Sequence, residues 1–142
     1  MDFSFLSPDN CVLNAGASNG DIQLVQTTLG ITIPNALVSF LKFSDGAVIS
    51  ERAILFSCQS SEESLVTYNN KETVTEFFRF GRFSADEFGY KRNDLSQADP
   101  PVYVLDHETN EYVLEANNLI EFVTKYNNYK PKKKKWYSFL FS

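Results

Sequence analysis

Two helical patterns of apolar residues lie close together near the start of the chain. The first predicts a helix over residues 21–29, ended by Gly30, because glycine readily adopts the left-handed conformation at a helix end. The second predicts a helix that begins at Pro34, whose missing N–H is no loss in a first turn, and stops before the turn pair Asp45-Gly46. Their apolar faces carry Ile22, Val25 and Leu29 in the first, and Leu37, Phe40 and Leu41 in the second.

Strand patterns and one short helix follow in the middle of the chain. A mostly apolar run predicts a strand over residues 53–58. Ser60 and Glu63 then stand at the spacing of a capping box, which predicts a short helix. A polar, turn-rich stretch further on contains another strand pattern over residues 88–92.

Alternation of side chains is clear over residues 75–83 and predicts a strand there. Phe78 and Phe80 fall on one face of this strand, and Arg79 falls on the other. Gly81 interrupts the pattern in the way that a bulge or a strand end does.

The clearest hairpin pattern pairs residues 102–105 with residues 111–114 through a polar connection. Two prolines precede its first strand, which fits the start of a strand because proline donates no ladder hydrogen bond. A last helix is predicted over residues 118–127, where Asn118 and Glu121 stand at capping-box spacing. Its apolar face carries Leu119, Phe122, Val123 and Tyr126.

The order of these elements is helix, helix, strand, short helix, several strands and a last helix. Strands grouped between terminal helices are typical of the α+β class, with a mostly antiparallel sheet flanked by helices. A chain of 142 residues is long enough for a core without disulfides. We therefore expect one domain over residues 1–129, followed by a tail over residues 130–142.

Charge differs sharply between these two parts. Residues 1–129 contain 18 acidic and 8 basic side chains, a net charge of −10, and the tail adds five lysines that bring the total to −5. An acidic body argues against nucleic acid as a partner, because that surface needs clustered lysine and arginine. It suits the capture of a basic protein, although many proteins are mildly acidic for solubility alone.

Seven residues are the candidate partner-binding residues. They are the turn acids Asp86, Glu87 and Asp94, the weaker acidic candidates Asp45 and Glu51, and the aromatic anchors Phe88 and Tyr90. Acids in turns point outward from a rigid scaffold, and buried aromatic anchors carry much of the binding energy of interfaces. We expect the acidic members to share one face of the protein.

Residues suited to catalysis or metal binding are few. His107 is the only histidine, and it falls in the predicted turn of the hairpin, where a solvated side chain is the ordinary case. No His/Cys cluster has metal-ligand spacing, and no glycine-rich phosphate loop occurs. The acidic run of Asp106, Glu108 and Glu111 lacks the ligand order of a calcium loop. We expect no enzymatic activity, no cofactor and no metal.

Cysteine usage and the N-terminus indicate a cytoplasmic protein with free thiols. Cys11 and Cys58 are far apart in the sequence and form no CxxC pair, which leaves a single disulfide as the alternative. The start of the chain lacks the basic and apolar regions of a secretory signal. No segment has the roughly 18 apolar residues that a membrane span needs.

The tail combines a lysine run with the apolar stretch "WYSFLFS". One interpretation is contact with an anionic lipid surface or nucleic acid. We favour the other, in which the lysines are a solvated linker and the apolar stretch packs back as a short edge strand.

Residues 29–46 resemble the signature of the SUKH superfamily, the SMI/KNR-type domains. The matching positions are Leu29, Gly30, Pro34, Phe40, Leu41 and Gly46. Residues 77–94 look like that family's apolar strand, glycine and acidic turn, and residues 100–126 resemble its closing hairpin and helix. The resemblance covers roughly residues 18–127, with Ile33 standing where the family usually has leucine.

The resemblance implies an α+β domain without enzymatic activity. Many bacterial members of the superfamily look like immunity proteins that neutralise a cognate toxin, often a nuclease, while eukaryotic and viral members act as regulatory or scaffolding modules. The sequence therefore favours a cytoplasmic immunity protein against a basic toxin domain. The alternatives are a regulatory protein-interaction module unrelated to toxins and an uncharacterised hydrolase.

Overall fold

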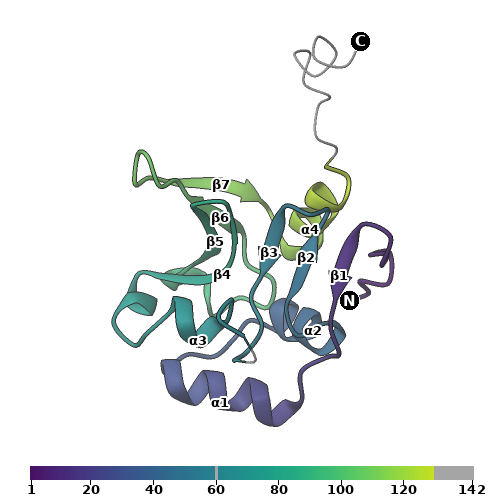
Figure 1. Ribbon diagram of the computed structural model, residues 1–142. Coiled ribbons are helices and arrows are strands. Elements are labelled where there is room, and N and C mark those ends of the chain that lie inside the picture. Colours follow the sequence, from purple (N-terminus) through teal and green to yellow (C-terminus); the bar gives the residue numbers. More distant parts are fainter. Residues whose placement is uncertain (60, 130–142) are drawn as a thin grey trace.

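One sheet of seven strands organises the chain, of which the computed structural model describes residues 1–59 and 61–129 (Figure 1). Each strand pairs antiparallel with its neighbour in the sequence, so the order across the sheet is the order along the chain. The strands are β1 (Cys11–Leu13), β2 (Ala47–Ile49), β3 (Ala53–Leu55), β4 (Phe77–Phe83), β5 (Asp86–Lys91), β6 (Val102–Leu105) and β7 (Tyr112–Ala116). The expected α+β class with an antiparallel sheet is confirmed.

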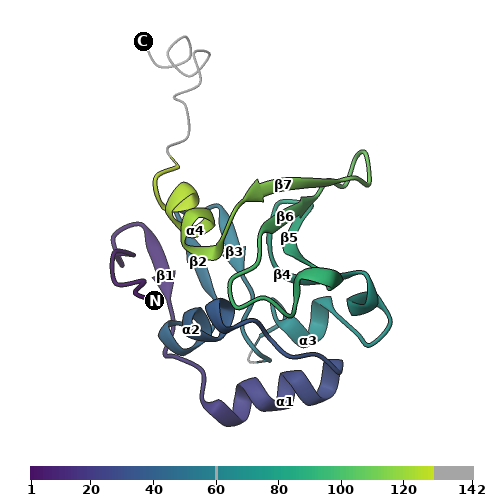
Figure 2. The same ribbon diagram turned by 180° about the vertical axis from the view of Figure 1, so that it is seen from behind.

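Four α-helices accompany the sheet in the described ranges. They are α1 (Asn19–Leu29), α2 (Asn35–Phe43), α3 (Leu65–Tyr68) and α4 (Leu119–Asn127), with single 3-10 turns η1 (Thr73–Thr75) and η2 (Arg92–Asp94) beside β4 and β5. Helices α2 and α4 lie behind β2 and β3 in Figure 1 and in front of them in Figure 2, so both cover the same face. None of these helices has the length and apolar character to cross a membrane.

The helix-covered face of the sheet carries the core. Phe80 and Phe88 pack against Phe122 of α4, with ring centroids 5.7 and 4.7 Å apart. Both strand residues are 1% exposed, and Tyr90 beside them is fully buried. These rings hold α4 on strands β4 and β5.

Within residues 1–59 and 61–129, no helix lies over the centre of the opposite face of the sheet. At its lower end, Tyr68 of α3 stacks on Phe56, with centroids 4.1 Å apart. Alternate strand positions elsewhere on this face keep partly exposed side chains, except for the buried Phe77, and we call it the open face. Its members are Val48, Ile54, Phe77, Arg79, Arg82, Glu87, Lys91, Tyr103, Tyr112 and Leu114.

The hairpin and the terminal helices agree with the sequence prediction in type and differ slightly in bounds. Helix α1 begins two residues early because Ser18 and Asp21 form a reciprocal capping box, each accepting the other's backbone N–H at 3.1 Å. Gly30 ends the helix with φ of 69°, as predicted. Strand β6 has the predicted bounds, and β7 runs over Tyr112–Ala116 rather than residues 111–114.

Two predictions in the middle of the chain are corrected. The short helix α3 begins after Ser64, whose hydroxyl accepts the N–H of Thr67 at 3.2 Å, so Glu63 precedes the helix; Ser60 lies outside the described residues. The strand expected at residues 53–58 ends at Leu55. Strands β1 and β2 were not predicted, because three residues each are too few to show an alternation of apolar and polar side chains.

Phe88 gives a direct test of the core. Phe88→Ala removes a ring that contacts Phe122 and Tyr126, so the free energy of unfolding should fall by about 3–5 kcal/mol. Chemical denaturation measures this value. The control Leu114→Ala truncates a side chain that is 53% exposed and should change stability by less than about 0.5 kcal/mol. Equal effects of the two substitutions would contradict the core placement of Phe88.

Candidate protein-interaction surface

The centre of the open face is organised by Arg79. Its backbone N–H donates to the side-chain carbonyl of Asn69 at 2.9 Å, and its own carbonyl accepts from the Asn69 amide at 2.8 Å. Nε of Arg79 donates to Oε1 of Glu87 at 2.9 Å, and the guanidinium lies 5.6 Å from the Phe77 ring centroid. Two strands are therefore joined by a fixed, half-buried ion pair.

A second ion pair lies beside the first. Nε of Arg82 lies 3.1 and 3.0 Å from the two carboxylate oxygens of Glu63, and a terminal guanidinium nitrogen also contacts this carboxylate. These hydrogen bonds from Arg82 lower the pKa of Glu63, and they raise the pKa of Arg82. Both groups are charged at neutral pH, and Arg82 ties β4 to the segment before α3.

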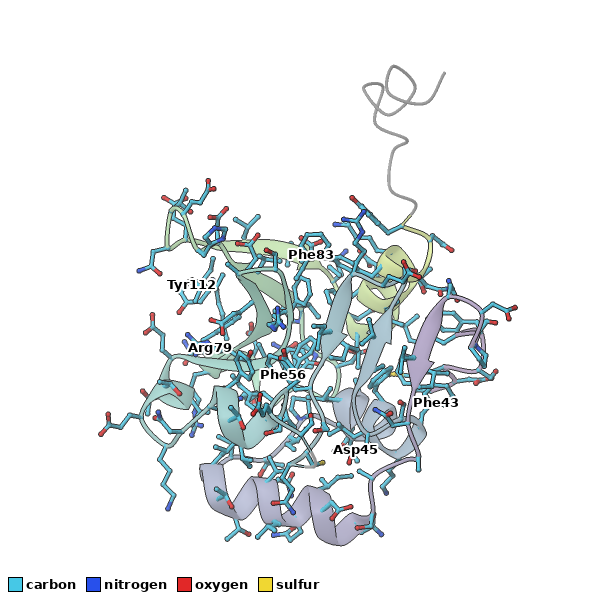
Figure 3. All side chains as sticks on the ribbon, in the orientation of Figure 1. Phe43, Asp45, Phe56, Arg79, Phe83 and Tyr112 are labelled. Carbon is cyan, nitrogen blue, oxygen red and sulfur yellow. The ribbon has the colours of Figure 1, made fainter. Side chains whose placement is uncertain are left out.

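An aromatic patch borders Arg79 on the open face (Figure 3). The rings of Phe77 and Tyr112 have centroids 4.9 Å apart, and Nζ of Lys91 lies 4.2 Å from the Tyr103 centroid. The pKa of Tyr112 is raised by burial and by the carboxylate of Glu76. The patch combines apolar rings with single hydrogen-bonding groups, a composition enriched at protein interfaces.

The β4–β5 turn, which Asp86 directly follows, and the β6–β7 turn lie at the same end of the sheet, and the acids beside and within them form a cluster that we call the acidic tips. The pairing of Glu87 with Leu105 brings the start of β5 next to the β6–β7 turn. The acidic tips consist of Asp86, Glu87, Asp106, Glu108 and Glu111. The tips adjoin the aromatic patch, because Tyr112 directly follows Glu111.

His107 joins the two turns. Its Nδ1 lies 2.6 Å from Oδ1 of Asp86, and its backbone N–H donates to the same oxygen at 3.1 Å. The hydrogen bond to Asp86 raises the pKa of His107 and lowers the pKa of Asp86. Asp106 shapes the turn by accepting the N–H of Glu108 at 2.8 Å.

The structure corrects the candidate site in several respects. Phe88 and Tyr90 are core residues whose rings point toward the helices, so they offer no anchor on the surface. Asp86 and Glu87 lie in strand β5 rather than in a turn, since the strand begins two residues before the predicted start.

The remaining candidates lie away from the acidic tips. The carboxylate of Asp45 accepts the N–H of Cys58 at 2.7 Å, near helix α2 (Figure 3). Glu51 lies in the β2–β3 turn with φ of 59°, and Asp94 belongs to η2 past the far end of β5. The expected grouping on one face is therefore not observed: Asp86 and Glu87 are neighbours in β5 but point to opposite faces of the sheet, and these three acids lie elsewhere.

Sequence reasoning did not select the acids of the β6–β7 turn or the aromatic patch. The predicted hairpin already placed Glu108 in one turn, with Asp106 and Glu111 directly beside it, which was a usable signal. Their meeting with Asp86 depends on the register between β5 and β6, and no local pattern gives that register.

Few groups here could support catalysis or hold a metal. The ligand atoms of Asp86, Asp106 and His107 lie within 4.8 Å of one another, the only such trio within residues 1–59 and 61–129. The Asp86 and Asp106 oxygens already accept N–H groups of the turn. Nε2 of His107 lies 4.0 Å from Glu108, and no described serine or cysteine hydrogen-bonds to it.

Both cysteines are free and buried. Burial and the nearby carboxylate of Asp45 raise the pKa of the Cys58 thiol to about 12. This thiol is therefore protonated at neutral pH and a poor nucleophile.

The pKa of His107 should be measurably high. Because the folded-state pKa is raised, the pair's contribution to stability is complete below the ordinary histidine value of about 6.5 and is lost as the pH rises through the folded value. At the acid end, the depressed pKa of Asp86 means that the contribution is lost as the pH falls through that lower value.

Proton NMR titration of the His107 ring checks the shift. Asp86→Asn should return the midpoint toward the ordinary value, while Asp94→Asn, in η2, should leave it unchanged. An ordinary midpoint in the unmodified protein would contradict the His107–Asp86 pairing.

Comparisons with known proteins agree with this architecture. The model of the SMI1 / KNR4 family (SUKH-1) matches residues 16–125, which include every element from α1 to most of α4. A search of curated proteins finds no match. The resemblance noted in the sequence is confirmed, and the chain belongs to the SMI1 / KNR4 family (SUKH-1).

Proposed function

We propose that this protein is a non-enzymatic immunity protein that binds and neutralises a protein toxin with a basic surface, a nuclease being the best-matched class. The observation that carries the proposal is the continuous surface formed by the acidic tips and the aromatic patch. The superfamily resemblance supports it, because many bacterial members look like toxin-immunity proteins.

Charge supports a basic partner. The acidic tips carry five carboxylates, of which Glu87 is paired with Arg79 and Asp86 with His107, while the glutamates of the β6–β7 turn remain exposed. A nuclease cleft is basic because it must bind a phosphate backbone. Complementary charges accelerate association and select against wrong partners, which is what an inhibitor of a fast-acting toxin needs.

The open face supports a stable complex. Tyr103 and Tyr112 are partly exposed, Lys91 contacts both of their rings, and the buried ring of Phe77 packs against Tyr112. Side chains that are already ordered lose little conformational freedom on binding, and aromatic side chains dominate interface energetics. The tips would speed the encounter, and the rings would slow dissociation.

A cytoplasmic and non-catalytic role fits the remaining chemistry. Buried free thiols are typical of a reducing compartment. His107 is half-exposed and engaged with Asp86 in joining two turns. His107→Ala should therefore leave toxin neutralisation intact, as measured by survival of cells that co-express toxin and variant.

A regulatory or scaffolding module is the second candidate. The balanced ion pairs of Arg79 with Glu87 and Arg82 with Glu63 favour it, because a near-neutral face also suits partners without a basic cleft. The neighbouring gene separates the two: the immunity role predicts that it encodes a toxin domain, and co-expression with this protein should abolish the toxicity of that domain. Undiminished toxicity and absence of a complex would contradict the immunity role.

Charge reversal at the acidic tips tests steering. Glu108→Lys with Glu111→Lys should slow association with that toxin domain by about tenfold at low salt and flatten the salt dependence. These exposed carboxylates are preferable to Asp86 and Glu87, which are already paired. Stopped-flow or surface-plasmon kinetics over a salt series measure the rate.

The matched control keeps the same net charge. Glu51→Lys with Glu72→Lys reverses two exposed acids outside the tips and should change the association rate much less. Equal slowing by both double variants would show that net charge, rather than the tips, attracts the partner.

Truncation within the aromatic patch tests the stable complex. Tyr112→Ala should raise the dissociation rate by at least about 30-fold, corresponding to a hot-spot loss of about 2 kcal/mol. Tyr112→Phe keeps the ring and should retain most of the affinity. Leu24→Ala, an exposed residue of α1, is the control and should bind normally. An unchanged dissociation rate in Tyr112→Ala would remove the patch from the interface.

A further inference from the structure

We propose that an apolar groove beside the acidic tips is the docking site of this chain's own C-terminal segment, residues 130–142. The groove has a volume of about 370 Å³ and lies on the helix-covered side of the sheet. It is formed by the end of β4, by β5, β6 and β7, and by the C-terminal part of α4. This inference is independent of any toxin.

The walls of the groove are aromatic and aliphatic. Phe83 at the end of β4 faces Tyr126 and Tyr129, with ring centroids 6.3 and 6.5 Å away, and Val104 of β6 completes the lining (Figure 3). Tyr129 remains 42% exposed. Such a concave apolar surface gains free energy when a further apolar side chain covers it.

The course of the chain brings a matching segment to this place. Tyr129 lines the groove and is directly followed by residues 130–135, which contain all five tail lysines. Six residues reach at most about 20 Å, which is enough for a turn back to the groove. The next residues are apolar: Trp136, Tyr137, Phe139, Leu140 and Phe141.

Charge around the groove favours this occupant. Asp86 and Glu115 lie on its rim, but Asp86 is paired with His107, so the exposed negative charges nearby are those of the β6–β7 turn in the acidic tips. The one lining lysine, Lys125, is already paired with Glu115, with Nζ 2.8 Å from Oε1. A segment that carries lysines followed by aromatic residues therefore meets the exposed acids of the tips beside the groove and rings inside it, whereas an anionic membrane would face the repulsion of the tips.

Trp136 is the only tryptophan of the chain, so its fluorescence reports on the segment directly. In the full chain, its emission should be blue-shifted and protected from acrylamide quenching relative to a synthetic peptide of residues 130–142. Phe83→Ala should shift emission and quenching toward the values of the peptide. Leu114→Ala, on the open face, is the control and should leave both unchanged.

Circular dichroism would reveal misfolding of Phe83→Ala. A second variant keeps the test valid in that case, because it changes only residues of the tail. Replacing Lys132, Lys133, Lys134 and Lys135 by serine leaves the described residues intact and should increase quenching, as should added salt in the unmodified chain.

Three results would overturn the proposal. Emission and quenching equal to those of the free peptide would show an empty groove. Protection that disappears on dilution would identify a second copy as the occupant. Protection that arises only on adding phosphatidylserine vesicles would identify a lipid surface. None of these outcomes bears on toxin binding, which is measured separately.

Discussion

The pairing register of β5 with β4 and β6 is the constraint on which the proposed surface depends. Alternation along β5 sends Phe88 and Tyr90 into the core and leaves Glu87 and Lys91 on the open face. A shift of one residue would bury the charges and expose the rings. Gly89 helps to fix the register, since a Cβ there would lie 2.2 Å from the carbonyl oxygen of Phe78.

The ion pairs of the open face matter more for geometry than for stability. Arg79 with Glu87 and Arg82 with Glu63 are partly exposed, and such pairs contribute only about 0–1 kcal/mol. Their hydrogen bonds instead hold β4, β5 and the segment before α3 in one arrangement. Binding surfaces benefit from this order, because less conformational freedom is lost when a partner arrives.

The sequence was sufficient for the parts of the fold that local chemistry determines. Helical spacing with Gly30 and Asn118 as end residues located α1 and α4, and the flanking prolines located β6. Strands β1 and β2 have three residues each, too few for a pattern, and they form only because they pair across the sheet. The residues around Asp86 predicted a turn, whereas Asp86 begins strand β5. Pairing with β4 and β6 outweighs the preference of these residues for turns.

The candidate site was harder to predict because it consists of contacts between segments that are distant in the sequence. Charge counting correctly indicated an acidic body but ranked acids by local context, so it treated Asp45 and Asp86 as members of one group. Only the fold shows that Asp86 meets His107 while Asp45 accepts the N–H of Cys58.

The two proposals, taken together, make the C-terminal segment a competitor of the partner. Its lysines would contact the same acidic region that is proposed to attract a basic toxin, and its tether gives it an effective concentration on the order of millimolar. A weakly bound basic protein could not displace a segment held at that concentration. A cognate toxin could, because under the proposal it would also contact the aromatic patch on the other face of the sheet, which the segment in its groove would leave free. Selectivity would then arise because a partner must contact both the acidic tips and the aromatic patch. The tail lysines would compete with basic proteins that are attracted by the negative charge alone.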